Sequence, residues 1–323
     1  MTSSWPAGAD PGQPPAVLAE EVAEALRDGR PVVALETTLV SHGFSGGRGA
    51  AVARAAEERV RGGGAVPATV GIIGGAIRVG LTPGELDAFA AAGTAARKAG
   101  ARDLAACAVQ GALGATTVGG TLAVCRRAGI RFMGTGGIGG VHRGFAHSLD
   151  ISADLPQLAR TEAVVVCSGA KSILDVPATA ELLETLGIPV LGWQTATMPL
   201  FYTADGGPAV SATVPDAAQA ARIAAAHWQL SPGRGLLLAR PPAGGVELSA
   251  LIDQAVDRVR QAGVTGQAVT PAVLAMVEEL SGGASIAVNE RLIADNAALA
   301  ADVAVAAARP PADPAGPPAE SSV

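Results

Sequence analysis

The chain of 323 residues is 49% hydrophobic and 16% charged, which supplies enough apolar material for a large globular core. Its net charge of -6 and aromatic content of 3% argue against a nucleic acid polymer as partner, because such proteins present basic surfaces and stacking rings. The N-terminus lacks the pattern of a signal peptide, and Gly, Pro or charge breaks every long apolar run. We therefore expect no membrane anchor and a cytoplasmic location.

Short β-rich runs alternate with Ala-rich helical segments along the chain. The predicted strands are residues 32–35, 70–73, 131–133, 163–167, 190–193 and 236–239. The predicted helices are residues 17–26, 48–61, 83–91, 121–128, 178–186, 217–228, 248–262 and 271–280. Such alternation is typical of layered α/β folds.

The two ends of the chain differ in composition from the middle. Residues 1–16 and 309–323 are rich in Pro, Gly, Ser and Ala, and we predict that both are disordered because they cannot bury enough apolar area. No long linker divides the middle, so residues 17–308 are predicted to form a single domain.

The three cysteines, Cys107, Cys125 and Cys167, lie in apolar surroundings without C-x-x-C spacing. They are predicted to be small buried side chains rather than disulfide or zinc ligands.

Two glycine-containing motifs resemble nucleotide-binding loops but lack the required context. Gly134, Gly136 and Gly139 satisfy G-x-G-x-x-G after a strand, yet the sequence that follows is too glycine-rich to open a helix. Backbone N–H groups of such a loop can still approach an anion. The segment 169–172 resembles the end of a Walker A loop, but Val165 stands where that motif needs its first glycine.

Lysine is rare in this chain: of 23 basic residues only Lys98 and Lys171 are lysines. Arginine stays protonated, whereas a buried lysine can lose its proton and attack carbon. The alternative is that both lysines are surface residues without a special role. Lys171, however, follows a predicted buried strand and so lies where ligands bind in open α/β sheets.

Five segments of the chain belong together: VALETT at 33–38, GATTV at 114–118, TGGIGGVHRG at 135–144, DISADL at 150–155 and GAKSILD at 169–175. In this order they closely resemble the pseudouridine-5'-phosphate glycosidase family, which includes homologues encoded with indigoidine biosynthesis. The match runs from about residue 31 to residue 300.

The resemblance implies a three-layer α/β/α sandwich with a central mixed, largely parallel sheet, assembled as a homotrimer. It implies the reversible cleavage of pseudouridine 5'-phosphate by water to uracil and ribose 5-phosphate, with a divalent metal, usually manganese. By position in the motifs, Lys171 matches the nucleophile, Glu36 the proton donor and Asp150 the metal ligand. The matches to substrate-binding positions are Lys98, Val118, Ser152, Ala153 and Asp154. Asn289 and His142 match further active-site positions.

The residue types suit this chemistry. Because the leaving atom is carbon, its expulsion needs a strong electron push, which the Lys171 amine supplies by forming an adduct at C1′ of an opened ribose. Ring opening needs a proton on the sugar ring oxygen, and Glu36, at the end of a predicted strand, is the best-placed carboxyl.

The phosphate and the metal need other groups. Lys98 is the expected counter-charge of the phosphate, helped by the hydroxyls of Thr116, Thr117 and Ser152. Asp150 with Asp154 would offer hard oxygen ligands to manganese or magnesium, with several waters retained.

Each assignment has a structural alternative. Glu36 could pair with an arginine, Asp150 could cap a helix at 151–158, Asn289 could hold a helix terminus, and His142 could be an ordinary loop histidine. The chain also departs from the family pattern at residues 44–49, which bears on base recognition and turnover.

Two other functions are also compatible with the sequence. One is a Schiff-base lyase or aldolase that acts on another sugar phosphate. The other is a catalytically inactive protein that binds a nucleotide phosphate.

Overall fold

The computed structural model describes residues 16–44, 46–264 and 269–309. Their strands form one sheet in the order β1-β4-β3-β2-β7-β8-β11-β9-β10, and β6 branches from β3 and carries β5. Neighbours are parallel except where β3 meets β4 and β6. The strands are β1 Ala16–Leu18, β2 Val32–Glu36, β3 Val66–Ile73, β4 Ala76–Val79, β5 Arg97–Ala99, β6 Gly114–Thr116, β7 Phe132–Gly134, β8 Val164–Cys167, β9 Val190–Trp193, β10 Ala212–Val214 and β11 Leu236–Ala239.

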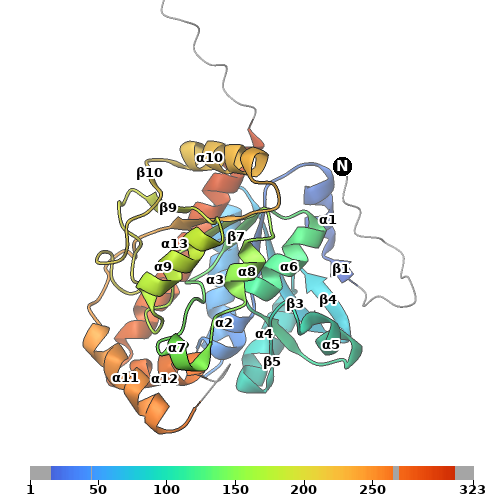
Figure 1. Cartoon of the computed structure of the whole chain (residues 1–323). Coiled ribbons are helices and arrows are strands. Elements are labelled where there is room, and N and C mark those ends of the chain that lie inside the picture. The colour runs from blue at the N-terminus through green and yellow to red at the C-terminus, as the bar shows by residue number, and fades with distance from the viewer. Residues whose placement is uncertain (1–15, 45, 265–268, 310–323) are drawn as a thin grey trace, which may run out of the picture.

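Helices cover both faces of this sheet, with α6, α8 and α9 in front of the strands and α3 and α13 behind them in Figure 1. Within these layers α3 packs on α13, and α6 packs on α8. The helices are α1 Glu20–Arg27, α2 Thr38–His42, α3 Arg48–Gly62, α4 Pro83–Ala92, α5 Leu104–Val109, α6 Val118–Ala128, α7 Phe145–Ser148, α8 Asp154–Leu158, α9 Val176–Thr185, α10 Ala217–Leu230, α11 Ser249–Gln261, α12 Val269–Leu280 and α13 Ala284–Ala308, with the 3-10 turn η1 Gly93–Ala95. The predicted three-layer α/β/α sandwich with a mixed, largely parallel sheet is confirmed.

Local sequence signals explain where several helices start. Thr82 and Glu85 form a reciprocal capping box at α4, with Pro83 in the first turn. Asp175 caps α9 by accepting the backbone N–H of Ala178. These signals fix the start of each helix, while burial of one face against the sheet stabilises it.

The first predicted helix, residues 17–26, is partly wrong. Residues 16–18 instead form β1, which pairs in parallel with β4, and the helix begins at Glu20. A three-residue strand exists only through its partner, and no local pattern encodes that partner. Ala16 therefore belongs to the sheet, whereas the remainder of the predicted disorder at 1–16 lies outside the described residues. At the other end, 310–323 lie outside them as well.

The 25-residue helix α13 has no counterpart among the predicted elements. It is rich in Ala and apolar around most of its circumference, because it lies between the sheet and α3 and contacts β2, β7 and β8. A helix buried on most sides gives little amphipathic pattern, and so periodicity did not reveal it. The three cysteines are free and buried, as predicted.

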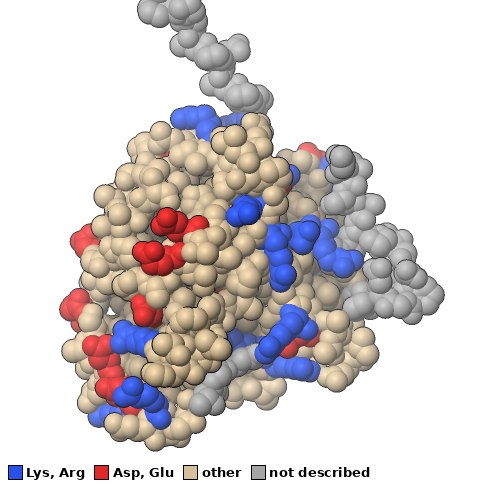
Figure 2. All heavy atoms as spheres, in the orientation of Figure 1, with Lys and Arg blue, Asp and Glu red and all other residues tan. Residues whose placement is uncertain are grey.

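Surface charge on the face shown in Figure 2 occurs in small groups of either sign, separated by wide uncharged areas. The basic groups on this face do not join into a continuous tract. Among the described residues, no helix combines the length and apolar character needed to cross a membrane.

Candidate active site

The candidate active site lies at the carboxyl ends of three neighbouring parallel strands, β2, β7 and β8. Glu36 is the last residue of β2, Thr135 follows β7, and Lys171 lies four residues beyond β8. Together with Lys98 and Asn289 they line one small cavity of about 50 Å³, which we call the inner chamber. Ligands bind at this edge of open α/β sheets because the loops there carry exposed polar groups.

Glu36 is a buried carboxyl with an exposed fraction of 4%. The Thr135 hydroxyl donates a hydrogen bond of 2.5 Å to Glu36 Oε1. Burial raises the pKa of Glu36 above its ordinary value, although the nearby Lys171 ammonium and the Thr135 hydroxyl both favour the ionised form. No arginine among the described residues bonds to this carboxyl, which disfavours the alternative of a structural ion pair. A carboxyl with a raised pKa keeps its proton to higher pH and is therefore suited to act as a general acid.

Asn296, fully buried in α13, contacts the residues that directly follow β7 and β8. Its amide Nδ2 lies 2.8 Å from the Thr135 carbonyl, 3.3 Å from the Gly136 carbonyl and 3.1 Å from Ser168 Oγ. A single amide thus ties together the backbone that follows β7 and the backbone that leads to Lys171. Sequence reasoning missed this residue because it lies in the unpredicted helix α13.

Lys171 is held by a tight loop after β8. Its backbone N–H donates to the Ile138 carbonyl at 3.0 Å, and the Ile138 N–H donates to the Gly169 carbonyl at 3.1 Å. Gly169 has φ +82°, and a Cβ there would lie 2.2 Å from the Pro199 carbonyl oxygen. Only glycine fits both the backbone angle and the close approach, so the loop geometry before Lys171 is fixed.

Lys98, in β5, lies within the electrostatic reach of the same groups. Burial lowers the pKa of Lys98, and the positive charge of Lys171 lowers it further, whereas Asp154, Glu36 and Asp150 act in the opposite direction. The structure therefore brings both lysines of the chain to one site, although they are 73 positions apart in the sequence.

The glycine-rich loop at 134–144 lies against a carboxylate of the protein itself, that of Asp154. Asp154 accepts the backbone N–H of Gly119 at 2.7 Å through Oδ1 and that of Gly139 at 2.9 Å through Oδ2. A Cβ on Gly139 would lie 2.2 Å from Ser152 Oγ, so this approach requires glycine. Both oxygens of Asp154 thus have backbone partners, and its assignment to the substrate stays a prediction.

The hydroxyls predicted to help bind the phosphate differ in their surroundings. Thr116 is fully buried, and its hydroxyl donates to the Val70 carbonyl, so it does not face a ligand. Thr117 caps α6 by accepting the Gly120 N–H at 3.1 Å, and Val118 is the first residue of that helix. Ser152 Oγ accepts the N–H of Asp154 at 3.2 Å, and Ala153 precedes α8.

Asp150 and His142 form a separate pair beside this region. His142 Nδ1 lies 3.8 Å from Asp150 Oδ2, and the Asp150 side chain is 35% exposed. Helix α8 begins at Asp154 with Ala153 as its cap, so the alternative role of Asp150 as a helix cap is wrong. In the part of the chain that the structure describes, no group of three or more His, Cys, Asp or Glu side chains is arranged to hold a metal ion.

Two more residues of the chamber went unnoticed in the sequence. Phe201 lines it with φ +65°, a strained backbone for a non-glycine residue, and its ring leaves room only for glycine at Gly137. His42 lines it too, with Nε2 donating to the Ala96 carbonyl at 3.0 Å. Asn289 lies inside α13 rather than at a helix end, which removes its structural alternative.

Replacing Thr135 with Val is expected to raise the pKa of Glu36 further, because the hydroxyl that stabilises the carboxylate is lost. Carbon-13 NMR of labelled glutamate during a pH titration measures this change. Thr161→Val serves as the control, since Thr161 is also buried but bonds to Gln157 at the other end of β8. A Glu36 pKa that does not move in Thr135→Val would show that this hydrogen bond has no role in its protonation.

Several known proteins are similar to this chain in sequence. Residues 21–306 match the family model described as indigoidine synthase A like protein. A relative from Salinispora tropica named pseudouridine-5'-phosphate glycosidase is 50% identical over 280 residues, which cover 84% of this chain and 86% of the relative. A second with that name, from Chloroflexus aurantiacus, is 48% identical over 285 residues, covering 85% and 93%.

A solved structure of similar fold is that of the prealnumycin C-glycosynthase AlnA in complex with ribulose 5-phosphate. It has a TM-score of 0.83 and 39% sequence identity, and the match covers 92% of this chain and 98% of that one. A family match over residues 21–306 and identities of this size over most of the chain establish common descent. The chain therefore belongs to the indigoidine synthase A like family, whose relatives named above include pseudouridine-5'-phosphate glycosidases.

Proposed function

We propose that this enzyme reversibly cleaves the C–C glycosidic bond of pseudouridine 5'-phosphate with water, giving uracil and ribose 5-phosphate. The observation that carries the proposal is that Glu36 and Lys171 line one chamber, at the carboxyl ends of the neighbouring parallel strands β2, β7 and β8. The names of the relatives at 48% and 50% identity support the same reaction. The ribulose 5-phosphate bound by the C-glycosynthase supports a five-carbon sugar phosphate as ligand.

In the proposed mechanism Glu36 and Lys171 act in sequence. The Lys171 amine attacks C1′, while the protonated Glu36 carboxyl delivers its proton to the ring oxygen and opens the ribose. The attached nitrogen loses a proton, and its lone pair then forms a C=N bond and expels the uracil carbon, which takes up that proton. Water finally hydrolyses the iminium to ribose 5-phosphate, which restores the Lys171 amine and returns a proton to Glu36. The buried Glu36 carboxyl, whose pKa is raised by burial, supplies the first proton.

Lys98 is assigned to the phosphate in this proposal. A phosphate monoester carries nearly two negative charges, and the ammonium of Lys98 is a compact point charge in the same region. Occupation by phosphate would oppose the loss of its proton that burial favours. Ser152, Thr117 and Asn289 are assigned to the remaining substrate contacts.

Asp150 is the proposed ligand for a divalent cation, which the resemblance described above implies to be manganese. A single carboxylate that is 35% exposed could hold a divalent cation that keeps several of its waters. Asp154 is not available as a second direct ligand while both its oxygens accept backbone N–H groups. When bound, the cation would neutralise charge on the substrate phosphate.

Replacing Asp150 with Asn is expected to weaken Mn²⁺ binding by about tenfold or more, because the amide offers no negative charge. The six-line EPR signal of free Mn²⁺ measures this without reference to turnover. Asp257→Asn provides the control, since Asp257 is an exposed carboxylate that pairs with Arg260 on the surface of α11. Equal Mn²⁺ affinity in wild type and Asp150→Asn would move the proposed metal site elsewhere.

The reaction itself is tested by following uracil release from pseudouridine 5'-phosphate in the presence of Mn²⁺. Release of uracil together with ribose 5-phosphate is expected. No turnover at micromolar enzyme would overturn the proposal and leave the Schiff-base lyase or the inactive binding protein as explanations. If the protein is an inactive binder, ligand should stabilise wild type and Lys171→Ala to the same extent.

The homotrimer and the cytoplasmic location expected from the sequence also remain predictions.

A further inference from the structure

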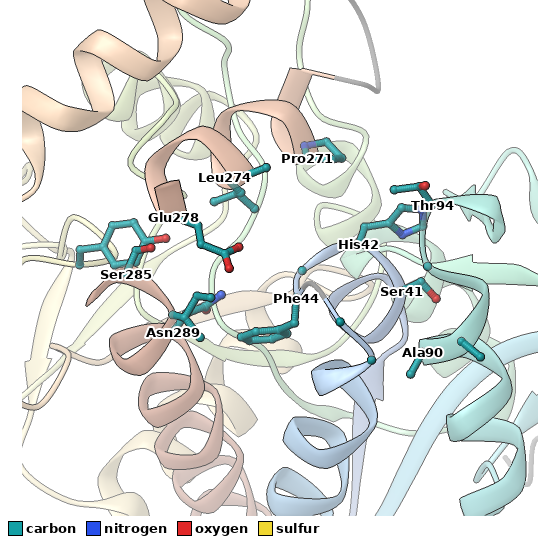
Figure 3. Close-up of a pocket in the computed structure, with 18 residues that line it drawn as sticks. Ser41, His42, Phe44, Ala90, Thr94, Pro271, Leu274, Glu278, Ser285 and Asn289 are labelled. Atoms are coloured by element: carbon teal, nitrogen blue, oxygen red, sulfur yellow. The ribbon is translucent and has the colours of Figure 1, made fainter. Parts of the chain in front are cut away.

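The whole chain contains two asparagines, and both lie in α13. Asn289 lines the inner chamber and also a larger cavity of about 430 Å³ that adjoins it, which we call the outer chamber. Figure 3 shows Asn289 among the residues that line the outer chamber. Asn296 follows two helical turns later on the same face of α13, but it is fully buried and lines neither chamber. The second asparagine therefore lies behind the site rather than in it.

Close packing of α13 on the end of β7 brings Asn296 within reach of the main chain. A Cβ at Gly134, the last residue of β7, would lie 2.9 Å from Ala297 Cα. One at Gly136 would lie 3.2 Å from the side chain of Ile293. Because both positions are glycine, the helix approaches closely enough for a short amide side chain to contact the backbone after β7.

The orientation of the Asn296 amide follows from its surroundings. Two of the three groups around Nδ2 are the carbonyl oxygens of Thr135 and Gly136, which can only accept, so this atom is the nitrogen. The amide oxygen Oδ1 is buried and has no hydrogen-bond partner within the described part of the chain. A buried oxygen without a partner destabilises the fold. What this side chain contributes is therefore the donation from Nδ2.

Two short paths lead from Asn296 Nδ2 to the groups assigned to the chemistry. On the first path, Thr135 accepts from Nδ2 through its carbonyl and donates to Glu36 through its hydroxyl. On the second path, Nδ2 contacts the hydroxyl of Ser168, which stands three residues before Lys171. One amide is thus connected to both groups, in each case through another residue.

We propose that Asn296 is a positioning residue, whose Nδ2 holds the acid Glu36 and the nucleophile Lys171 in the relative position that the chemical step needs. The inference rests on the proposed function and adds to it a residue that touches no substrate. A displacement of about 1 Å in a reacting group can lower a rate by roughly 10²-fold. A residue behind the reacting groups should therefore affect the chemical step and leave substrate binding nearly unchanged.

Replacing Asn296 with Ala is expected to lower kcat for uracil release at least tenfold and to change KM less than threefold. The backbone hydrogen bond from Thr135 N–H to the Val166 carbonyl remains, so the strand ends stay paired while their alignment loosens. Gln157→Ala is the matched control, expected to keep kcat within twofold. Gln157 is also a buried carboxamide, but its Nε2 donates to Thr161 at the other end of β8.

Carbon-13 NMR of labelled glutamate separates positioning from a general loss of stability, and it needs no substrate. Asn296→Ala is expected to raise the pKa of Glu36, because the Thr135 hydroxyl that favours the carboxylate is no longer held in place. In a Thr135→Val background the same replacement should leave this pKa unchanged, since the connecting hydroxyl is absent. Gln157→Ala should not move the pKa in either background.

Asn296→Asp provides a second variant in case Asn296→Ala does not fold, because aspartate keeps the shape of the side chain. Burial favours its protonated form, which has one O–H donor in place of two N–H donors. Its kcat is expected at least threefold below wild type and above that of a folded Asn296→Ala.

The outcomes distinguish this inference from the proposed function. A wild-type kcat in either folded Asn296 variant, or an equal fall of kcat in Gln157→Ala, would overturn the positioning role and leave the proposed function intact. If wild type itself releases no uracil, the proposed function fails. A Glu36 pKa that does not move in Asn296→Ala would then overturn the positioning role as well.

Discussion

Replacing Lys171 with Ala is expected to abolish uracil release from pseudouridine 5'-phosphate, by roughly 10⁴-fold or more, because loss of the nucleophile in a covalent enzyme removes most of its rate enhancement. The other lysine of the inner chamber does not replace it, since Lys98 is assigned to the phosphate of the same substrate. Single-turnover measurement of uracil by absorbance separates the chemical step from product release.

Trapping of the adduct checks the same prediction directly. Borohydride reduction of wild-type enzyme mixed with ribose 5-phosphate is expected to leave one sugar phosphate on the peptide that contains Lys171. Lys171→Arg is the matched control, since arginine keeps the positive charge beside Glu36 but does not form an imine. An adduct on Lys98, or a Lys171→Ala enzyme that still turns over, would refute the assignment of the nucleophile.

Replacing Glu36 with Gln is expected to lower the rate of ribose ring opening by about 10²–10⁴-fold, the usual contribution of a general acid. Glutamine keeps the shape of the side chain and an acceptor for the Thr135 hydroxyl, but it has no proton to give. The wild-type rate should fall as pH rises through the raised pKa of Glu36, and the residual rate of Glu36→Gln should lack this alkaline limb. Matching pH profiles for the two proteins would assign the proton to another group.

Stability against pH separates this chemical effect from misfolding. Because the pKa of Glu36 is raised in the folded state, its favourable contribution is complete below the unfolded pKa and is lost as pH rises through the folded one. Glu36→Gln carries no such penalty. Relative to wild type it should therefore gain stability between acid and neutral pH, as measured by urea unfolding. A variant that is slower yet more stable is the expected signature of a catalytic acid.

Much of the fold followed from local sequence pattern. The apolar runs at 190–193 and 236–239 became strands with the predicted bounds, and the helix at 217–228 needed only two more residues. Buried parallel strands are continuous apolar runs bounded by turns, so their signal lies within a few residues. The short strands β5 and β6 lacked that signal, since three residues form a strand only through pairing with a distant partner.

The candidate site, like the fold, was predictable from the sequence only in part. The sequence alone singled out Lys171, because it is one of two lysines and follows a buried strand, and it placed Glu36 at the end of another. Neither position reveals that β2, β7 and β8 are neighbours, and this is what brings the two side chains into one chamber. Strand order depends on the packing of the whole sheet, which no single segment encodes.

What the sequence by itself determined is therefore the chemical inventory: the fold class, the motifs, and the residue types able to act as nucleophile, acid and phosphate ligand. Only the tertiary structure decided their environment. It showed that Asp154 is held by the backbone N–H groups of Gly119 and Gly139, that Asn296 ties Thr135 to the loop before Lys171, and that an outer chamber adjoins the inner one. The reason is physical: residue type fixes what a group can do, whereas burial, hydrogen-bond partners and cavity shape arise from contacts between segments far apart in the chain.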